Sequence, residues 1–232
     1  MALKPGGTRG SLRAVSPGVL NIPEGDLRHR YDATDGDSVI ESGSVSEWQD
    51  QQATADLTGT ATERLASAIN GTPAISHDGV DDTLTHSAPP NPPLEMYVVA
   101  QWQGTEGSDV SDIEGLIDAD GSHAIRSWKG EFQVRSGSRT TASGPSADKD
   151  PHIFLLRVAS DGGFELYLEN TLEVADSGDG RDADTLRTCT QGGDQRYGEW
   201  YVGEILVYND LNSASERDTI FSVLGRKWDI TV

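Results

Sequence analysis

A tryptophan flanked by two cations is the first feature of this sequence that could bind a ligand. Trp128 lies two residues after Arg126 and directly before Lys129-Gly130, where the sequence predicts the turn of a hairpin. A pyranose has an apolar face and a rim of hydroxyls, so an exposed tryptophan beside polar side chains suits sugar recognition. Tyr197, just before another predicted strand, is a second aromatic residue that we expect at the surface. We predict that Trp128, Arg126, Lys129 and Tyr197 bind a ligand; packing of Trp128 in the core is the alternative.

Three aspartates on a predicted turn could hold a hard cation. Asp78, Asp81 and Asp82 lie on either side of Gly79-Val80. Carboxylate oxygens are ligands that calcium prefers, so the sequence predicts a candidate calcium site here. A second candidate group lies in one acidic loop and consists of Asp176, Asp179, Asp182 and Asp184. Chance clusters are also expected, because the chain has 38 acidic residues.

The short motifs of several catalytic classes are missing. The sequence has no Gly-x-Ser-x-Gly nucleophile elbow, no glycine-rich phosphate loop and no His-Glu-x-x-His helix. The single Cys189 excludes a disulfide within the chain, and no group of cysteines and histidines has zinc-binding spacing. The histidines are scattered, and we expect them to be structural.

Charge is the most unusual bulk property of the chain. It carries 38 acidic against 18 basic residues, a formal net charge of −20, and only four of its basic residues are lysines. A dense carboxylate surface suits concentrated salt, where screening removes the repulsion that would destabilise the compact state. We therefore predict a halophilic protein; cation binding or simple solubility is the alternative. Such a field repels nucleic acid and anionic membranes, so neither is expected as a partner.

The N-terminal segment differs from the rest in both composition and charge. Residues 1–27 are rich in glycine and proline and carry an excess of cations, including Lys4, Arg9 and Arg13. They predict an extended arm before a single domain of residues 28–232. A basic arm on an acidic body favours docking onto other subunits of an assembly; a loose terminus is the alternative. The arm has no apolar core of signal-peptide length, and no run in the chain approaches the ~20 apolar residues that span a bilayer.

Most of the chain predicts short strands joined by turns. It contains 26 glycines and 10 prolines, and residues 94–102, 152–159 and 164–169 have strong strand patterns. Residues 74–84 predict a hairpin that turns at Asp78-Gly79. In all we expect about ten to twelve strands, a number that suits a sandwich of two antiparallel sheets.

The C-terminal segment predicts a buried strand followed by a helix. Residues 200–208 are apolar on both alternating faces, as in a strand that is covered on each side. Ser213 and Glu216 have the spacing of a capping box, which begins a helix. Apolar residues then recur at helical spacing, at Ile220, Phe221, Leu224 and Trp228.

A series of segments resembles the concanavalin A-like lectin/glucanase superfamily, in its laminin-G-like branch. The similarity covers about residues 28–230 and rests on the order and spacing of Tyr31-Asp32-Ala33, Trp48-Gln49-Asp50, His77 to Leu84, Phe154 to Asn170, Gly198 to Tyr208, Leu211 to Arg217 and Lys227-Trp228. The chain departs from the pattern at His77, where the family more often has phenylalanine. The resemblance implies an all-β fold, a jelly roll of two antiparallel sheets with one short C-terminal helix. Laminin-G-like modules often have a calcium site, so the resemblance also favours calcium as a ligand.

Lectins, adhesion modules and hydrolases all share the fold of this superfamily, so the resemblance does not fix the activity. Glycosidase members carry paired acids as Glu-x-Asp-x-x-Glu on one strand, and this chain has no such spacing. Glu165 and Glu169 flank apolar residues on a predicted strand, where a solvated outer face explains them. We therefore predict that the protein is not an enzyme.

Together these features predict a recognition module at a surface. Our first hypothesis is a virion surface protein of a halophilic virus, whose arm docks on other virion subunits and whose sandwich binds a cell-surface glycan or glycoprotein. A carbohydrate-binding or adhesion module of a halophilic cell is the second hypothesis, and an unrecognised glycan hydrolase is the third. The first two predict a virion or extracellular location, and we expect a homo-oligomer.

Overall fold

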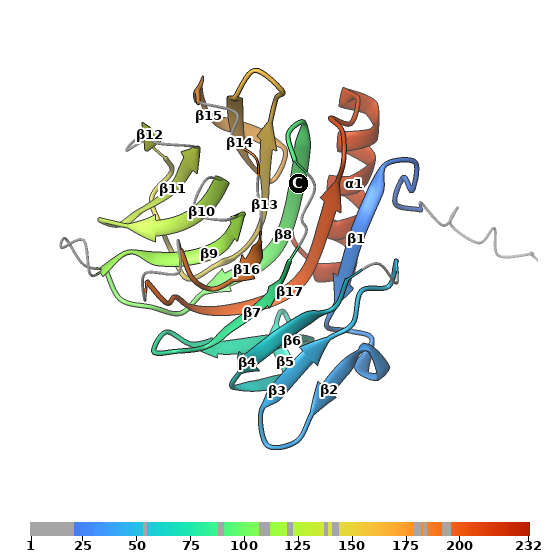
Figure 1. Ribbon diagram of the computed structural model, residues 1–232, viewed down its shortest axis with the longest axis vertical. Coiled ribbons are helices and arrows are strands. Elements are labelled where there is room, and N and C mark those ends of the chain that lie inside the picture. The colour runs from blue at the N-terminus through green and yellow to red at the C-terminus, as the bar shows by residue number, and fades with distance from the viewer. Residues whose placement is uncertain are drawn as a thin grey trace, which may run out of the picture.

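Two antiparallel β-sheets face each other in this protein and form a sandwich (Figure 1). We describe the fold from a computed structural model. It describes residues 21–52, 55–87, 91–106, 112–119, 123–136, 139–140, 144–178, 182, 185–191 and 196–232. The prediction of an all-β sandwich with a C-terminal helix is confirmed.

Sheet A contains eight strands among the described residues, in the order β15-β14-β13-β8-β17-β6-β5, with β1 also paired to β17. The strands are β1 (Leu27–Asp32), β5 (Glu63–Ile69), β6 (Thr72–Asp78), β8 (Leu94–Trp102), β13 (Pro151–Val158), β14 (Gly163–Leu168), β15 (Thr171–Ser177) and β17 (Glu199–Tyr208).

Sheet B contains nine strands in the described part of the chain, in the order β12-β11-β10-β9-β16-β7-β4-β3-β2. They are β2 (Val39–Glu41), β3 (Val45–Trp48), β4 (Leu57–Ala61), β7 (Thr83–His86), β9 (Glu114–Ala119), β10 (His123–Trp128), β11 (Glu131–Ser136), β12 (Arg139–Thr140) and β16 (Leu186–Thr188). A short 3-10 helix (Gly36–Ser38) precedes β2.

The central strands of sheet A are buried on both faces. Val98 and Ile205, on β8 and β17, belong to the core between the two sheets. Their neighbours Tyr97 and Leu206 belong to a second core on the other face of sheet A. Alternation along each strand sends successive side chains to opposite faces, which is why these strands are apolar on both faces over most of their length. The prediction of a last strand that is covered on both sides is confirmed.

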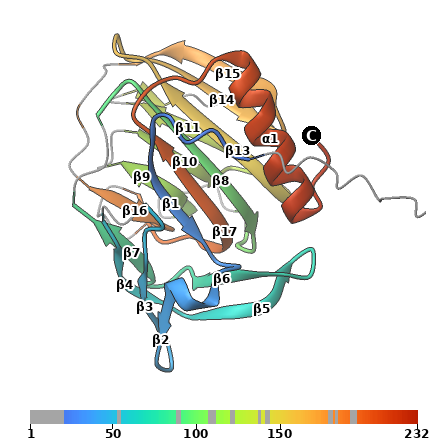
Figure 2. The same ribbon diagram turned by 90° about the vertical axis from the view of Figure 1, so that its right-hand side faces the viewer.

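The second core lies beneath the helix α1 (Ala214–Trp228), which covers the outer face of sheet A (Figure 2). The Ser213 side chain accepts from the backbone N–H of Glu216, and the Glu216 carboxylate accepts from the backbone N–H of Ser213 at 2.9 Å. The predicted capping box is therefore confirmed. Ile220, Phe221, Leu224 and Trp228 are all buried against the sheet.

Gly203 lets the last residue of the helix sit close to the sheet. A Cβ atom at this position would lie 2.5 Å from the Trp228 ring. The neighbouring Glu204 is buried and accepts from the Trp228 indole at 3.0 Å and from Lys227 at 2.6 Å. The predicted fold marker, a strand that leads into a helix ending in Lys-Trp, is thus held by a polar contact as well as by packing.

One predicted hairpin is wrong. β6 belongs to sheet A and β7 to sheet B, so the turn at Asp78-Gly79 carries the chain from one sheet to the other. Gly79 has the positive φ of 74° that the Asp-Gly pair predicts. The turn chemistry was therefore read correctly, but a turn does not fix which strands its flanking segments pair with. The side chain of His77 is fully buried between the sheets and contacts Thr188 at 3.1 Å.

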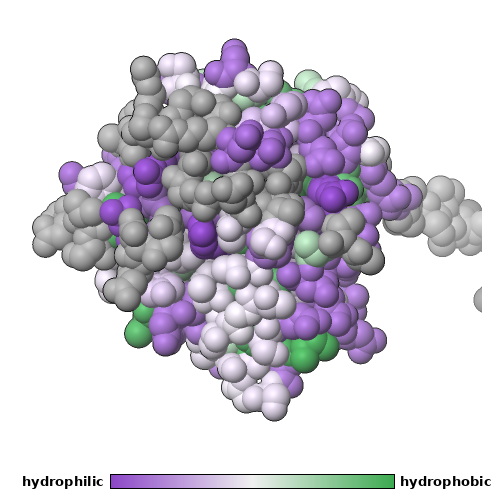
Figure 3. Space-filling model, in the orientation of Figure 1, coloured by the Kyte–Doolittle hydropathy of each residue, from purple (hydrophilic) through white to green (hydrophobic). Residues whose placement is uncertain are grey.

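The surface is mostly hydrophilic, and hydrophobic side chains are scattered on the face in Figure 3. The large exposed hydrophobic residues among those described are Ile40, Val80, Leu172 and Val232. None of the described helices has the length and apolar character needed to span a membrane.

Candidate functional site

The predicted ligand-binding residues of the 126–129 segment lie on the outer face of sheet B. β10 and β11 form a hairpin whose turn, Lys129-Gly130, has positive φ angles of 55° and 72°. Ile125 points into the core between the sheets, so Arg126 and Trp128 share a face away from Trp200 and the other core residues. Register places Gln133 of β11 opposite Arg126. The hairpin therefore sets a cation, an amide and an indole side by side.

A glycine brings a third polar residue onto this face. Gly115 of β9 is paired with Arg126, and a Cβ atom there would lie 2.3 Å from the carbonyl carbon of Thr190. The segment after β16 can cross the sheet only because that Cβ is absent. Cys189 makes the bend, with a positive φ of 52°. The crossing leaves Gln191 fully buried next to Arg126.

We call Arg126, Gln133 and Gln191 the Arg126 cluster. The guanidinium donates to Oε1 of Gln191 at 3.1 Å and to Oε1 of Gln133 at 3.0 Å. Arg126 is only 3% exposed, yet its Nε has no hydrogen-bond partner among the described residues, and neither has Nε2 of Gln191. A buried donor without a partner costs about 1–3 kcal/mol. Such groups call for an explanation, and a ligand is one.

The electrostatics of the cluster are opposite to those of the chain as a whole. Burial, with the positive charges of Arg135 and Arg196, lowers the pKa of Arg126 to about 10. No carboxylate among the described residues pairs with Arg126. Nearby on the same face, Arg187 has the usual arrangement and contacts Asp118 at 3.4 Å. The Arg126 cluster is therefore a positive site on a protein of net charge −20.

Trp128 lies at the edge of the cluster and is half-buried. The Arg126 guanidinium carbon lies 5.3 Å from the centroid of its ring, and the ammonium of the exposed Lys129 lies 4.2 Å from it. The structure thus brings together three of the four predicted ligand-binding residues. Arg126 is more deeply buried than a residue of a hairpin tip would be.

Tyr197 approaches the same region from another strand. The backbone of Arg196 accepts from Gly115 at 3.3 Å, and the backbone of Gly198 donates to Cys189 at 2.8 Å. Tyr197 therefore runs beside β9, one strand away from β10, and is half-buried. A role in ligand binding stays a prediction for all four residues.

Sequence reasoning missed two members of the cluster. Gln133 could have been found, since a two-residue turn at Lys129-Gly130 fixes the register that places it opposite Arg126. Gln191 could not, because it reaches the site through a crossing that only the tertiary structure defines.

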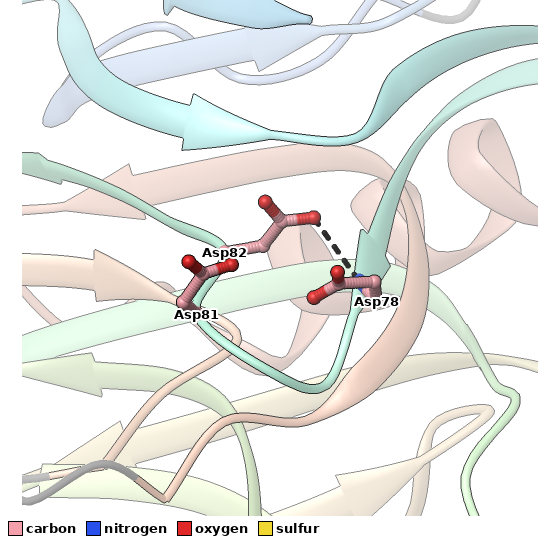
Figure 4. Close-up of side chains that lie close together, drawn as sticks. All are labelled: Asp78, Asp81 and Asp82. Carbon is pink, nitrogen blue, oxygen red and sulfur yellow. Dashed lines mark hydrogen bonds between the residues drawn. The ribbon is translucent and has the colours of Figure 1, made fainter.

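The three aspartates of the predicted calcium site do lie together (Figure 4). Their ligand oxygens lie within 4.8 Å of one another. However, Asp82 accepts from the backbone of Asp78 at 3.1 Å and from Thr62 at 2.5 Å, while Asp78 accepts from the backbone of Val80 at 2.8 Å. These bonds account for the turn without a cation. The carboxylates could supply oxygen ligands, and calcium binding stays a prediction.

Other predicted residues fall partly or wholly outside the described part of the chain. Lys4, Arg9 and Arg13 of the arm lie there, as do Asp179 and Asp184 of the second acidic group. The described end of the arm packs on sheet A: Ile22 is buried in the core beneath α1, and the backbone of Pro23 accepts from the Tyr208 hydroxyl at 2.9 Å.

A second arginine lies beside a cavity of about 300 Å³ on sheet A. The cavity is lined by Arg157, Phe164, Glu165, Asp176 and Leu211, among others. We predicted that a solvated outer face explains Glu165, but its carboxylate also contacts Arg157 at 2.7 Å. Glu169 likewise contacts His152, at 3.0 Å.

Comparison with known proteins places this chain by its fold. No protein-family model matches the sequence, and no curated protein sequence is significantly similar to it. Among solved structures, Trypanosoma rangeli sialidase matches 89% of this chain with a TM-score of 0.67 at 13% identity. The binding domain of Paraclostridial Mosquitocidal Protein 1 matches 84% with a TM-score of 0.59 at 12% identity. Botulinum neurotoxin type C, whose structure concerns interaction with two ganglioside molecules, matches 86% with a TM-score of 0.52 at 8% identity.

These matches show the fold: a β-sandwich of the jelly-roll, concanavalin-like type. The chain corresponds to 34% of the sialidase chain, 52% of the mosquitocidal chain and 51% of the neurotoxin chain. It therefore spans about a third to a half of the proteins that it resembles.

The comparison overturns the prediction that the protein is not an enzyme. That prediction rested on missing motifs, above all the paired acids of one glycosidase pattern. The matching structures include sialidases, which are enzymes and lack sequence similarity to this chain beyond 13–14% identity. The absence of one motif thus does not separate this fold from enzymes.

Proposed function

We propose that this protein recognises glycans through the outer face of sheet B around Trp128. The observation that carries the proposal is the half-buried indole next to buried hydrogen-bonding side chains, Arg126 and Gln133, on the hairpin of β10 and β11. A sugar can stack its apolar face on the indole while its hydroxyls reach the polar groups. The matching structures add support, because they include glycan-processing enzymes and a toxin that interacts with gangliosides.

The finer proposal concerns where recognition takes place. A laminin-G-like module on the surface of a halophilic virus, docked by its N-terminal arm, accounts for both the acidic body and the basic arm. Under this proposal the protein would form a homo-oligomer, its arm would bind other virion subunits, and the Trp128 face would bind the host surface. A carbohydrate-binding or adhesion module of a halophilic cell would use the same face.

A glycan array probed with the full chain tests the proposal, at high and at moderate salt. Trp128→Ala should weaken binding to the glycans that give a signal by at least tenfold. Tyr201→Ala is the matched control. Tyr201 is also a half-buried aromatic residue, but it packs on the outer face of sheet A, on the other side of the sandwich from Trp128. Circular dichroism checks that both variants fold.

The proposal fails if no glycan binds under either condition, or if the two variants lose binding equally. Analysis of the recovered glycans measures hydrolysis in the same experiment. Deletion of residues 1–20 should leave glycan binding intact and abolish assembly with other virion subunits if the arm is the docking element.

A further inference from the structure

Arg126 differs from three partly buried arginines of this chain. Arg30, Arg157 and Arg187 each contact a carboxylate, at 3.0, 2.6 and 3.4 Å. Arg126 is buried and contacts two neutral amides instead. The chain has 38 acidic residues and 18 basic ones, so a carboxylate partner within the fold would be easy to supply. Its absence from the described surroundings leaves the guanidinium charge without a counterion.

The chemistry of the three side chains fixes what a ligand must offer. A guanidinium has donors and no acceptor. Gln133 and Gln191 must therefore turn their oxygens toward Arg126 and their NH2 groups away from it. The two groups left without a partner, Nε of Arg126 and Nε2 of Gln191, are both donors. A group that satisfies them must be an acceptor, and a carboxylate is acceptor-only with two oxygens.

The surrounding charge selects an anion. The positive charges of Arg135 and Arg196 act on Arg126, whereas no carboxylate among the described residues pairs with it, so an anion would be favoured at the guanidinium. The surface elsewhere is dominated by carboxylates, which repel an anionic ligand. An acidic ligand would therefore be bound at this place in preference to others.

Trp128 adds the reason to expect a sugar rather than a simple anion. Its ring centroid lies 5.3 Å from the guanidinium carbon, so a carboxylate at Arg126 would place an attached ring against the indole. The donors are buried, and the half-buried Trp128 is the neighbour of the guanidinium that extends toward solvent. Because the donors are buried, a ligand would reach them only if this side chain shifted.

We propose that the Arg126 cluster binds the carboxylate of an acidic sugar, with Nε of Arg126 and Nε2 of Gln191 as the donors that the sugar completes. This inference rests on the proposed glycan recognition and names its ligand class.

The test uses isothermal titration of the full chain with two acidic sugars, glucuronic acid and N-acetylneuraminic acid, each beside its methyl ester. The ester keeps the ring and removes the negative charge. We expect at least one acid to bind at least tenfold more tightly than its ester. Inorganic sulfate, titrated separately, should bind more weakly than that acid, because it has no ring to stack on Trp128.

Two variants locate the effect. Arg126→Met should lower affinity for the acid by at least tenfold and leave affinity for the ester unchanged. Arg226→Met is the matched control, because Arg226 is an exposed arginine on α1 and its loss changes the net charge equally. Gln191→Glu would supply a carboxylate to Arg126 from within the chain, so it should abolish binding of the acid and raise the melting temperature.

The outcomes separate the two proposals. Equal affinity for acid and ester, or full affinity in Arg126→Met, overturns the carboxylate site and leaves glycan recognition standing. Sulfate binding as tightly as the acid also overturns it, since the cluster would then be a general anion site. If neither these sugars nor any arrayed glycan binds, the proposed function itself fails. Should Arg126→Met not fold, Gln191→Glu decides: unchanged binding of the acid overturns the inference.

Discussion

Two arginines on opposite sides of the sandwich, the buried Arg126 and the partly buried Arg157, hold their charge in different ways. Arg157 of sheet A contacts Glu95 at 2.6 Å and Glu165 at 2.7 Å. Burial alone would lower the pKa of Arg157, but hydrogen bonds and charges from these two carboxylates raise it above its ordinary value. Arg126 of sheet B has only amide partners, and its pKa falls to about 10.

The difference separates a charge that stabilises the fold from one that can still bind a ligand. Glu95 also accepts from Tyr97 at 3.0 Å and from the Asn212 side chain at 2.7 Å, so the Arg157 pair ties β8 and β13 to the segment that leads into α1. Every strong group there is used within the fold. In the Arg126 cluster, by contrast, two buried donors have no hydrogen-bond partner, and no carboxylate among the described residues pairs with the guanidinium.

Glu95→Ala should give the largest loss of stability. The residue is fully buried, and its removal leaves Arg157, Tyr97 and Asn212 without their shared acceptor. Breaking a buried pair in this way costs about 3–5 kcal/mol of unfolding free energy. Glu165→Ala is the control: its side chain is 35% exposed, and an exposed pair contributes about 1 kcal/mol or less. Equal losses in urea denaturation would contradict the structural role of Glu95.

Acid should destabilise the protein through His77, which joins the two sides of the sandwich. Burial lowers the pKa of His77 to about 4. In the unfolded chain it takes up a proton near pH 6.5, whereas the folded protein resists until about pH 4. Stability is therefore fully present above pH 6.5 and falls as pH drops through this window, by about 3 kcal/mol at pH 4.

The measurement is the unfolding free energy at several pH values in His77→Phe and in the unmodified protein. Other groups also titrate in this range, so the difference between the two slopes is the quantity of interest. A slope that stays the same in His77→Phe would contradict the prediction.

A smaller loss is expected where the Arg157 side of the molecule begins its helix. Ser213→Ala removes the acceptor for the backbone N–H of Glu216 and should cost about 1 kcal/mol, as other N-cap losses do. Ser215→Ala makes the same change two residues later, at an exposed position, and should cost only about a few tenths of a kcal/mol. Thermal denaturation of both variants measures the difference.

Arg126→Met should cost less stability than the same change at Arg157. It removes a buried charge but leaves Oε1 of Gln133 and of Gln191 without their donor, so the cost should be about 1–2 kcal/mol. Arg157→Met, by contrast, leaves Glu95 buried and charged and should cost about 3 kcal/mol. If the two variants are equally destabilised in urea, Arg126 is structural and the comparison does not hold.

The sequence predicted those parts of the fold that local chemistry controls. The capping box at Ser213, the apolar stripe of α1 and the turn at Lys129-Gly130 each depend on residues that are close in sequence. Strands β2 and β12 have only three and two residues, too few for alternation to be recognised, which is one reason why the expected number of ten to twelve strands was too low. The pairing of β6 was missed because its partners, β5 and β17, are chosen by the whole sheet.

The candidate site shows the same limit. Arg126 and Trp128 stood out because an aromatic residue beside cations at a predicted hairpin turn suits sugar recognition. Gln191 is 65 residues away from Arg126, and Gly115 gives no sign in the sequence that another segment will cross over it. The burial of Arg126 follows from that crossing and could not be predicted without it.

The distribution of tryptophans gives this protein a built-in optical probe. Trp48, Trp102, Trp200 and Trp228 are all fully or almost fully buried, and Trp128 alone of the five is half-buried. A soluble quencher such as iodide should therefore reduce the emission of Trp128 and leave that of the others nearly unchanged. The emission that a quencher removes is then a signal from one side chain, and a sugar stacked on that indole would shield it without any label on the protein.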